Sequence, residues 1–125
     1  MTAFNYFSKA NSDGSYDVKL SLDGDPSNGN LNGTFIYKGD PFRVIGYWAA
    51  AGSTDDRKYN ALCFSGADAA SGTVFVAATG TFTMNSDGSW QMQLNCLRVS
   101  TNNDHQYGWD GELYSAAPDD PGDDF

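Results

Sequence analysis

Apolar and polar residues alternate at every second position in segment after segment of this chain. In the segment YDVKLSL (16–22) every second residue is apolar, and the residues between them are Asp, Lys and Ser. Successive side chains of a β-strand point to opposite faces, so this pattern predicts a strand with one buried face. No apolar repeat of helical period is sustained over three turns. The sequence therefore predicts an all-β protein.

The pattern recurs in eight segments, and short stretches rich in turn residues separate them. Asp13-Gly14 and Asp87-Gly88 are typical of hairpin turns, because Gly, Asn and Asp tolerate a positive φ. Short connections favour an antiparallel up-and-down meander, which eight strands can close into a barrel without exposed edges. A two-sheet β-sandwich is the alternative. The predicted strands are 3–9, 16–22, 31–38, 42–49, 58–66, 73–84, 90–100 and 106–115.

Glycines inside the predicted strands indicate sharp bends or a close approach of two backbones, as a small barrel requires. They are Gly33, Gly46, Gly66, Gly80 and Gly111. The segment NSDGSY (11–16) also recurs as NSDGSW (85–90). We interpret this repeat as one favoured hairpin turn used twice, with a duplicated half-domain as the alternative.

The chain has 125 residues and a net charge of −9, and fifteen of its sixteen acids are Asp, a residue that favours turns. Four of these Asp lie in the closing stretch PDDPGDDF (118–125). We therefore expect one β-barrel domain over 1–116 and an acidic disordered tail over 117–125. The negative charge argues against nucleic acid and anionic membranes as partners.

The N-terminal residues 1–5 lack the basic and apolar regions of a signal peptide. The compartment stays open between the cytoplasm and a secreted domain in mature form. We expect Cys63 and Cys96 to be free, buried thiols, because they fall on the fifth and seventh strands, which are not neighbours. No C-x-x-C spacing is present, and neither a metal nor a cofactor is expected.

Residues suited to catalysis are few, so we expect no enzyme. His105 is the single histidine and falls in a polar loop. Asp110 and Glu112 lie two apart on one strand, roughly 7 Å, which is compatible with a small carboxylate-dependent hydrolase. The hydrolase hypothesis is the second alternative, because acids on the polar face of a strand are usually solvated. The acidic stretch 23–30 resembles the start of a calcium loop, but Thr34 stands where such a loop needs Glu, which favours a turn.

Aromatic residues are numerous for this length and carry the main functional hypothesis. We expect a non-enzymatic binding module for a small molecule or glycan, with an aromatic-lined pocket at a barrel mouth. The candidate ligand-binding residues are Trp48, Trp109, Tyr37 and Tyr107. Simple filling of the core by these rings is the structural alternative. A structural or self-assembling interaction protein, and hence a homo-oligomer, is the first alternative function.

The order of several segments resembles the avidin/streptavidin family of eight-stranded meander barrels. The similar stretches are LNGTF (31–35), FRVIGY (42–47), TGTF (79–82) and LNCLRVS (94–100). The resemblance implies the barrel but not biotin binding. The family's tyrosine on the biotin carbonyl would fall on Phe35, its stacking tryptophans on Ala78 and Cys96, and its aspartate near Leu113. The family's opening Gly-Thr-Trp-Tyr-Asn pattern is also missing.

Overall fold

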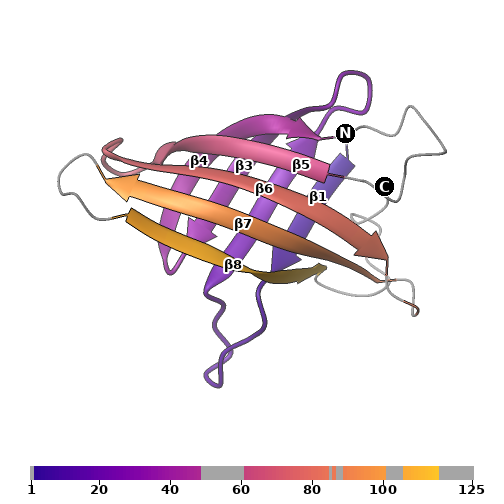
Figure 1. Cartoon of the computed structure of the whole chain (residues 1–125), viewed down its shortest axis with the longest axis horizontal. Helices are drawn as coiled ribbons and strands as arrows, with labels where there is room; N and C mark the ends of the chain where they lie inside the picture. The colour runs from indigo at the N-terminus through magenta and orange to yellow at the C-terminus, as the bar shows by residue number, and fades with distance from the viewer. Residues whose placement is uncertain (1, 49–60, 85, 87–88, 101–105, 116–125) are drawn as a thin grey trace.

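The computed structural model describes residues 2–48, 61–84, 86, 89–100 and 106–115. These residues form eight antiparallel strands in one closed barrel (Figure 1). The strands are β1 (Thr2–Phe7), β2 (Val18–Gly24), β3 (Asn30–Tyr37), β4 (Asp40–Trp48), β5 (Ala61–Asp68), β6 (Val74–Met84), β7 (Trp90–Ser100) and β8 (Gln106–Ser115).

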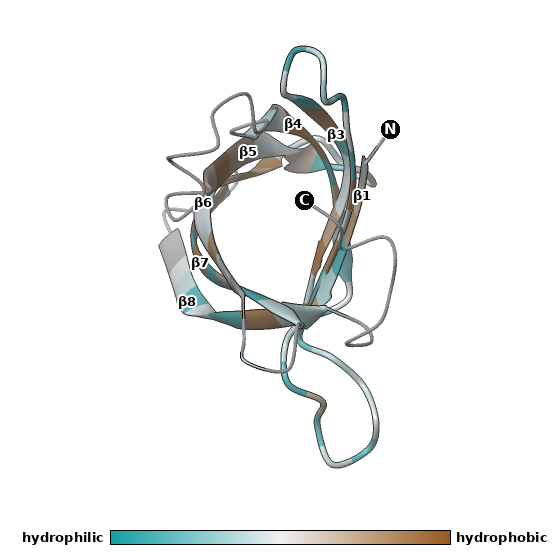
Figure 2. Cartoon of the chain, turned by 90° about the vertical axis from the view of Figure 1, so that its right-hand side faces the viewer, coloured by the Kyte–Doolittle hydropathy of each residue, from teal (hydrophilic) through white to brown (hydrophobic). Residues whose placement is uncertain are grey.

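Each strand pairs with the next along the chain, and the ring closes between β8 and β1 (Figure 2). Within the described residues that closing contact has two residue pairs, Tyr6 with Ser115 and Phe7 with Tyr114. The structure thus confirms the predicted meander barrel and not the sandwich. The main shift is in the second strand, which begins at Val18, because Tyr16 instead bridges Ala10 in the β1–β2 connection.

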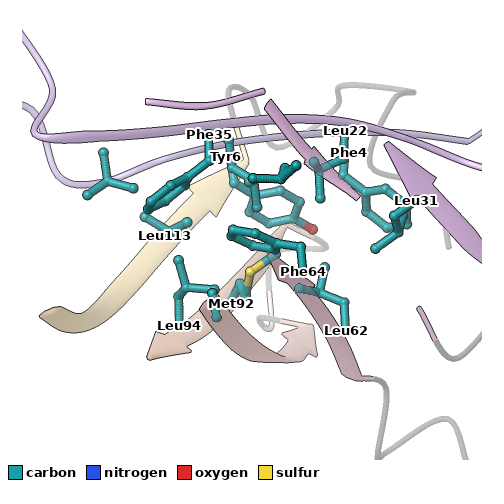
Figure 3. Packing of buried hydrophobic residues seen from close by; sticks show 14 of the residues in the cluster. Phe4, Tyr6, Leu22, Leu31, Phe35, Leu62, Phe64, Met92, Leu94 and Leu113 are labelled. Carbon is teal, nitrogen blue, oxygen red and sulfur yellow. The ribbon is translucent and has the colours of Figure 1, made fainter. Parts of the chain in front are cut away.

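Alternation along the strands fills the barrel with apolar side chains. β2 alternates strictly between buried and exposed residues. Side chains from different walls meet in the interior, among them Phe35 of β3 and Phe64 of β5 (Figure 3), whose ring centroids lie 5.2 Å apart. The ring centroids of Phe4 and Phe82 lie 5.8 Å apart. Such pairs add to the stability from burial alone. The buried core comprises Phe4, Tyr6, Val18, Leu20, Leu22, Leu31, Phe35, Phe42, Val44, Trp48, Leu62, Phe64, Val76, Ala78, Phe82, Met92, Leu94 and Leu113.

Two strand glycines let β4 and β5 approach closely, as predicted. A Cβ added at Gly46 would collide with the backbone carbonyl oxygen of Cys63, and one at Gly66 with that of Arg43. Both obstacles are backbone atoms of a paired strand, so neither can move without breaking the ladder.

Three connections use one device, in which an Asp carboxylate accepts hydrogen bonds from residues two or three positions later. Asp13, Asp25 and Asp68 each accept the backbone N–H of the second following residue at 2.9 Å. Asp25 also accepts the Ser27 hydroxyl, so the stretch 23–30 forms the turn that was favoured over a calcium loop. The first copy of the NSDGS repeat forms the loop around Asp13, while much of the second lies outside the described residues.

The two cysteines are free thiols on β5 and β7, with β6 between them, as predicted. The expectation that both are buried is wrong for Cys63, which is exposed, and Cys96 is half-buried. Cys63 lies between the buried Leu62 and Phe64, so alternation turns its side chain outward.

The predicted tail, 117–125, lies outside the described residues, as do 58–60 at the start of the predicted fifth strand. In the described part of the chain no helix has the length and hydropathy needed to span a bilayer.

The substitution Gly46→Ala should destabilise the barrel by about 1 to 3 kcal/mol, because its Cβ is forced against the neighbouring backbone. Gly108→Ala is the matched control on β8, since the nearest atom to its Cβ would be the Cys96 carbonyl oxygen at 3.9 Å. Urea unfolding of both variants checks this. Equal stabilities would contradict the account of the β4–β5 approach.

The turn carboxylates make stability depend on acid pH. Hydrogen bonds from the Ser15 and Ser27 hydroxyls, and from the Ala70 N–H, hold the pKa of Asp13, Asp25 and Asp68 respectively below the ordinary 3.8. The folded chain therefore takes up these protons less readily than the unfolded chain. This contribution is complete above the ordinary pKa and is lost as pH falls through and below that value.

We expect the urea midpoint to drop between about pH 5 and about pH 3, and to drop less in the triple variant Asp13→Asn, Asp25→Asn, Asp68→Asn. Asn keeps an acceptor oxygen for each turn but cannot titrate. Parallel pH curves for the wild type and the triple variant would contradict this role.

Candidate functional site

One end of the barrel carries charged and aromatic side chains on the lumen side. At this end β3 finishes at Tyr37, β4 begins at Asp40, β5 finishes at Asp68 and β7 finishes at Ser100. We call it the Arg98 mouth, after the residue whose side chain crosses it.

Arg98 faces inward because it continues the lumen-facing row of β7. Met92 and Leu94 on that row are fully buried, Cys96 and Arg98 follow at the same period, and Leu97 between them is exposed. The row leaves the packed centre of the barrel at Cys96. A charged side chain can therefore occupy the next inward position while its head stays near water.

The Arg98 guanidinium reaches the opposite part of the rim. Its Nη2 lies 3.2 Å from Oδ2 of Asp40, and its Cζ lies 6.0 Å from the ring centroid of Tyr37 and 5.9 Å from that of Phe42. β5 and β6 separate β7 from β4 in the barrel wall. The side chain thus spans the mouth and holds its cation over two aromatic rings.

Further charges surround the guanidinium. The pKa of Asp68 is lowered by the Ala70 N–H and the Ser71 hydroxyl, and the positive charge of Arg98 adds a smaller contribution. Lys38 places its Nζ 5.7 Å from the centroid of the Tyr37 ring. The Tyr37 ring therefore already has two cations beside it.

Trp109 and Cys96 form a half-buried pair on the lumen side, one inward position deeper in the barrel than Arg98 and Tyr107. The two residues are paired across β7 and β8, and both pack against the core. Burial raises the pKa of the Cys96 thiol, so the thiol stays protonated at neutral pH. Gly111 leaves room for the indole, because a Cβ there would lie 2.8 Å from a Trp109 ring atom. Tyr107 is the backbone partner of Arg98, and its side chain lies outside the described residues.

Trp48 is not part of this group. It closes the opposite end of the barrel, buried with its ring edge-on to Phe4 at 5.1 Å between centroids. Tyr37 and Trp48 both end their strands, and β3 and β4 are antiparallel, so the two residues lie at opposite ends. The structure thus gathers Tyr37, Trp109 and the backbone of Tyr107 at one mouth and leaves Trp48 in the core.

Positive charge collects in the half of the barrel that holds this mouth. Every Lys or Arg in the described residues lies there: Lys9, Lys19, Lys38, Arg43 and Arg98. The opposite half carries Asp23 and Asp25 without a described cation. The mouth half also carries Asp13, Asp17, Asp40 and Asp68, so its described charges nearly balance, whereas those of the opposite half do not. Among the described residues, an anion therefore meets less repulsion at this mouth.

The carboxylates of the hydrolase alternative lie elsewhere. Asp110 and Glu112 are exposed on the outside of β8, and the Tyr114 hydroxyl donates a hydrogen bond of 2.6 Å to Glu112. His105 lies outside the described residues. Over the described ranges no three His, Cys, Asp or Glu side chains cluster so as to hold a metal ion.

Arg98 itself was not among the residues predicted for the site. The signal was present, because alternation from Met92 and Leu94 puts residue 98 on the lumen side. Its partner Asp40 could not be found in this way, since the pairing depends on how the ring of strands closes.

No protein-family model matches the chain, and no curated protein matches it in sequence. The geometry of the mouth therefore has to carry any functional conclusion.

The substitution Arg98→Gln should lower stability by no more than about 1 to 2 kcal/mol. Arg98 and Asp40 are 27% and 52% exposed, and ion pairs and cation–π contacts at such sites contribute little. Urea unfolding measures the difference. An unfolded Arg98→Gln protein would instead mean that the barrel depends on this side chain to close its end.

Proposed function

We propose that this chain is a non-enzymatic binding barrel whose Arg98 mouth takes a small molecule bearing a carboxylate. The observation that carries the proposal is the guanidinium held across the mouth between Asp40 and the rings of Tyr37 and Phe42. A guanidinium recognises a carboxylate through two parallel hydrogen bonds, which a lysine cannot match.

The Asp40 carboxylate binds the Arg98 guanidinium at the place where a ligand carboxylate would bind. The Asp40 side chain is about half exposed, so the ion pair is weak and a ligand can replace it at low cost. Asp40 then swings toward water, and the guanidinium keeps a negative partner throughout. The cations Lys38 and Arg98 at this mouth favour the approach of the anion.

The apolar part of the ligand has aromatic surface to pack against. Trp109 is half-buried and pairs with Cys96, which lies two residues before Arg98 on β7. Tyr37 lies across the mouth. Aromatic rings beside a guanidinium suit an aromatic acid and an acidic sugar equally well. The ligand can therefore be a small aromatic acid or an acidic glycan.

We propose that the ligand differs from biotin, although the barrel order is like that of the avidin family. Phe35 and Leu113, at or near positions where that family has hydrogen-bonding residues, are fully buried apolar side chains. A polar ligand reaching them would lose hydrogen bonds to water without replacement.

Tryptophan fluorescence and calorimetry against matched acids and amides test the proposal. Benzoate with benzamide, and glucuronate with glucose, separate the carboxylate from the rest of each molecule. We expect binding of at least one acid and weaker binding of its neutral partner, with affinity reduced about 10- to 100-fold by Arg98→Gln. Asp40→Asn should strengthen binding several-fold, because it removes the competing carboxylate.

Silence across the acids in both the wild type and Asp40→Asn would overturn the proposal. Equal affinity for acids and amides, or for the wild type and Arg98→Gln, would also overturn it. Arg98→Lys is the conservative control, and it should bind with intermediate affinity because lysine keeps the charge but loses the paired hydrogen bonds.

A further inference from the structure

Large apolar side chains gather on the outside of the barrel over β4, β6 and β7. Ile45 is 70% exposed, Tyr47 63%, Phe75 and Leu97 45% each, and Val99 36%. Side chains of this size are costly to leave in water when they are contiguous. β4 to β7 lie next to one another in the barrel (Figure 1), so the five side chains share one face, here called the outer face.

The pairing register gives the outer face a ridge, a groove and a second ridge. Ile45 on β4 pairs with Ser65, Ser65 with Ala77, and Ala77 with Leu97 on β7. This row across the strands thus runs from large to small, small and large, and in the neighbouring row the large Phe75 on β6 pairs with Val99 on β7. A shallow hollow of about 920 Å³ lies over the small residues, and a second of about 650 Å³ adjoins it toward Phe75.

Acidic side chains are absent from the outward-facing positions of β4 to β7 within the described ranges. Arg43 is the one charged residue that these positions hold there. Outward positions of other strands do carry acids, with Asp23 on β2 and Asp110 and Glu112 on β8. Two copies of a chain with net charge −9 repel each other, and this face is where they can meet without burying a carboxylate.

We infer that the outer face is the interface of a homodimer related by a two-fold axis. A two-fold interface brings a surface against itself, so each ridge must find a groove on the partner. The chain supplies both: Ile45 and Leu97 form ridges, and the Ser65–Ala77 strip forms the groove. Exposed polar residues such as Thr79 and Asn95 border the apolar rows, as the rim of an interface requires.

The inference does not rest on the proposed ligand site. The outer face uses outward side chains of β4 to β7, whereas Arg98 faces the lumen. Either could fail without the other.

Sedimentation velocity from low to high micromolar concentration tests the dimer. We expect the wild type to sediment as a dimer, and Ile45→Asp to raise the dimer dissociation constant about 100-fold or more, because each dimer contains the substitution twice. Ala77→Tyr should do the same by filling the groove while adding apolar surface. Ser21→Asp, which adds the same charge on the exposed side of β2, should leave the dimer unchanged.

Ile45 and Ala77 are exposed, so both variants should keep the fold. Far-ultraviolet circular dichroism checks this. A wild type that stays monomeric at high micromolar concentration would overturn the inference. Dimers that survive both Ile45→Asp and Ala77→Tyr would overturn it as well.

Alkylation of Cys63 provides a second readout, because this exposed thiol lies on the outer face beside Tyr47. Its reaction rate, followed by peptide mass spectrometry, should fall in proportion to the dimeric fraction and recover in Ile45→Asp. Cys96, half-buried on the lumen side, serves as the internal reference. A Cys63 rate that is independent of protein concentration would contradict the interface.

Discussion

Closure of the ring between β8 and β1 is the interaction on which the rest of the structure depends. Two residue pairs of the described chain make that contact, and with it every strand is paired on both sides. Once the ring is closed, each strand must direct one row of side chains to the lumen and the other to the outside. The lumen is then filled by aromatic rings and aliphatic side chains from all walls. This packing stabilises the closed ring where the short β8–β1 contact supplies few hydrogen bonds.

The same closure divides the molecule into places with different chemistry. The centre is packed, with Phe35, Met92 and Leu94 fully buried, so function has to lie at an end or on the outside. At one end the inward row of β7 arrives at Arg98, opposite Asp40. Outside, the register places Ile45 and Leu97 at the two ends of one row, with the small Ser65 and Ala77 between them. Charge follows the same division: among the described residues, the lysines and arginines lie toward the Arg98 mouth, and the outer face of β4 to β7 carries no acid, in a chain of net charge −9.

Much of the fold could be predicted from the sequence because alternation is a local property. The eight strands, their order and the close approach at Gly46 all follow from short segments and their turns. The exposure of Cys63 was predictable in the same way from Leu62 and Phe64, and treating a cysteine as a core residue overrode that pattern.

The site was less predictable, because it depends on which strand ends meet. Tyr37 and Trp48 are equally good candidates in the sequence, because both are aromatic. Their antiparallel strands place them at opposite ends of the barrel. The contact of Arg98 with Asp40 joins residues 58 positions apart across three steps of the ring. A pattern within one short segment cannot predict a contact between residues so far apart in the chain.

The most direct test of the central claim is a nuclear magnetic resonance titration that resolves arginine side-chain Nε–H and tryptophan indole N–H signals. Carboxylate ligands binding at the Arg98 mouth should shift the Arg98 and Trp109 signals together, to saturation, and leave the Trp48 indole unmoved at the far end. Shifts confined to Trp48, or an Arg98 signal unchanged while other signals saturate, would contradict the account.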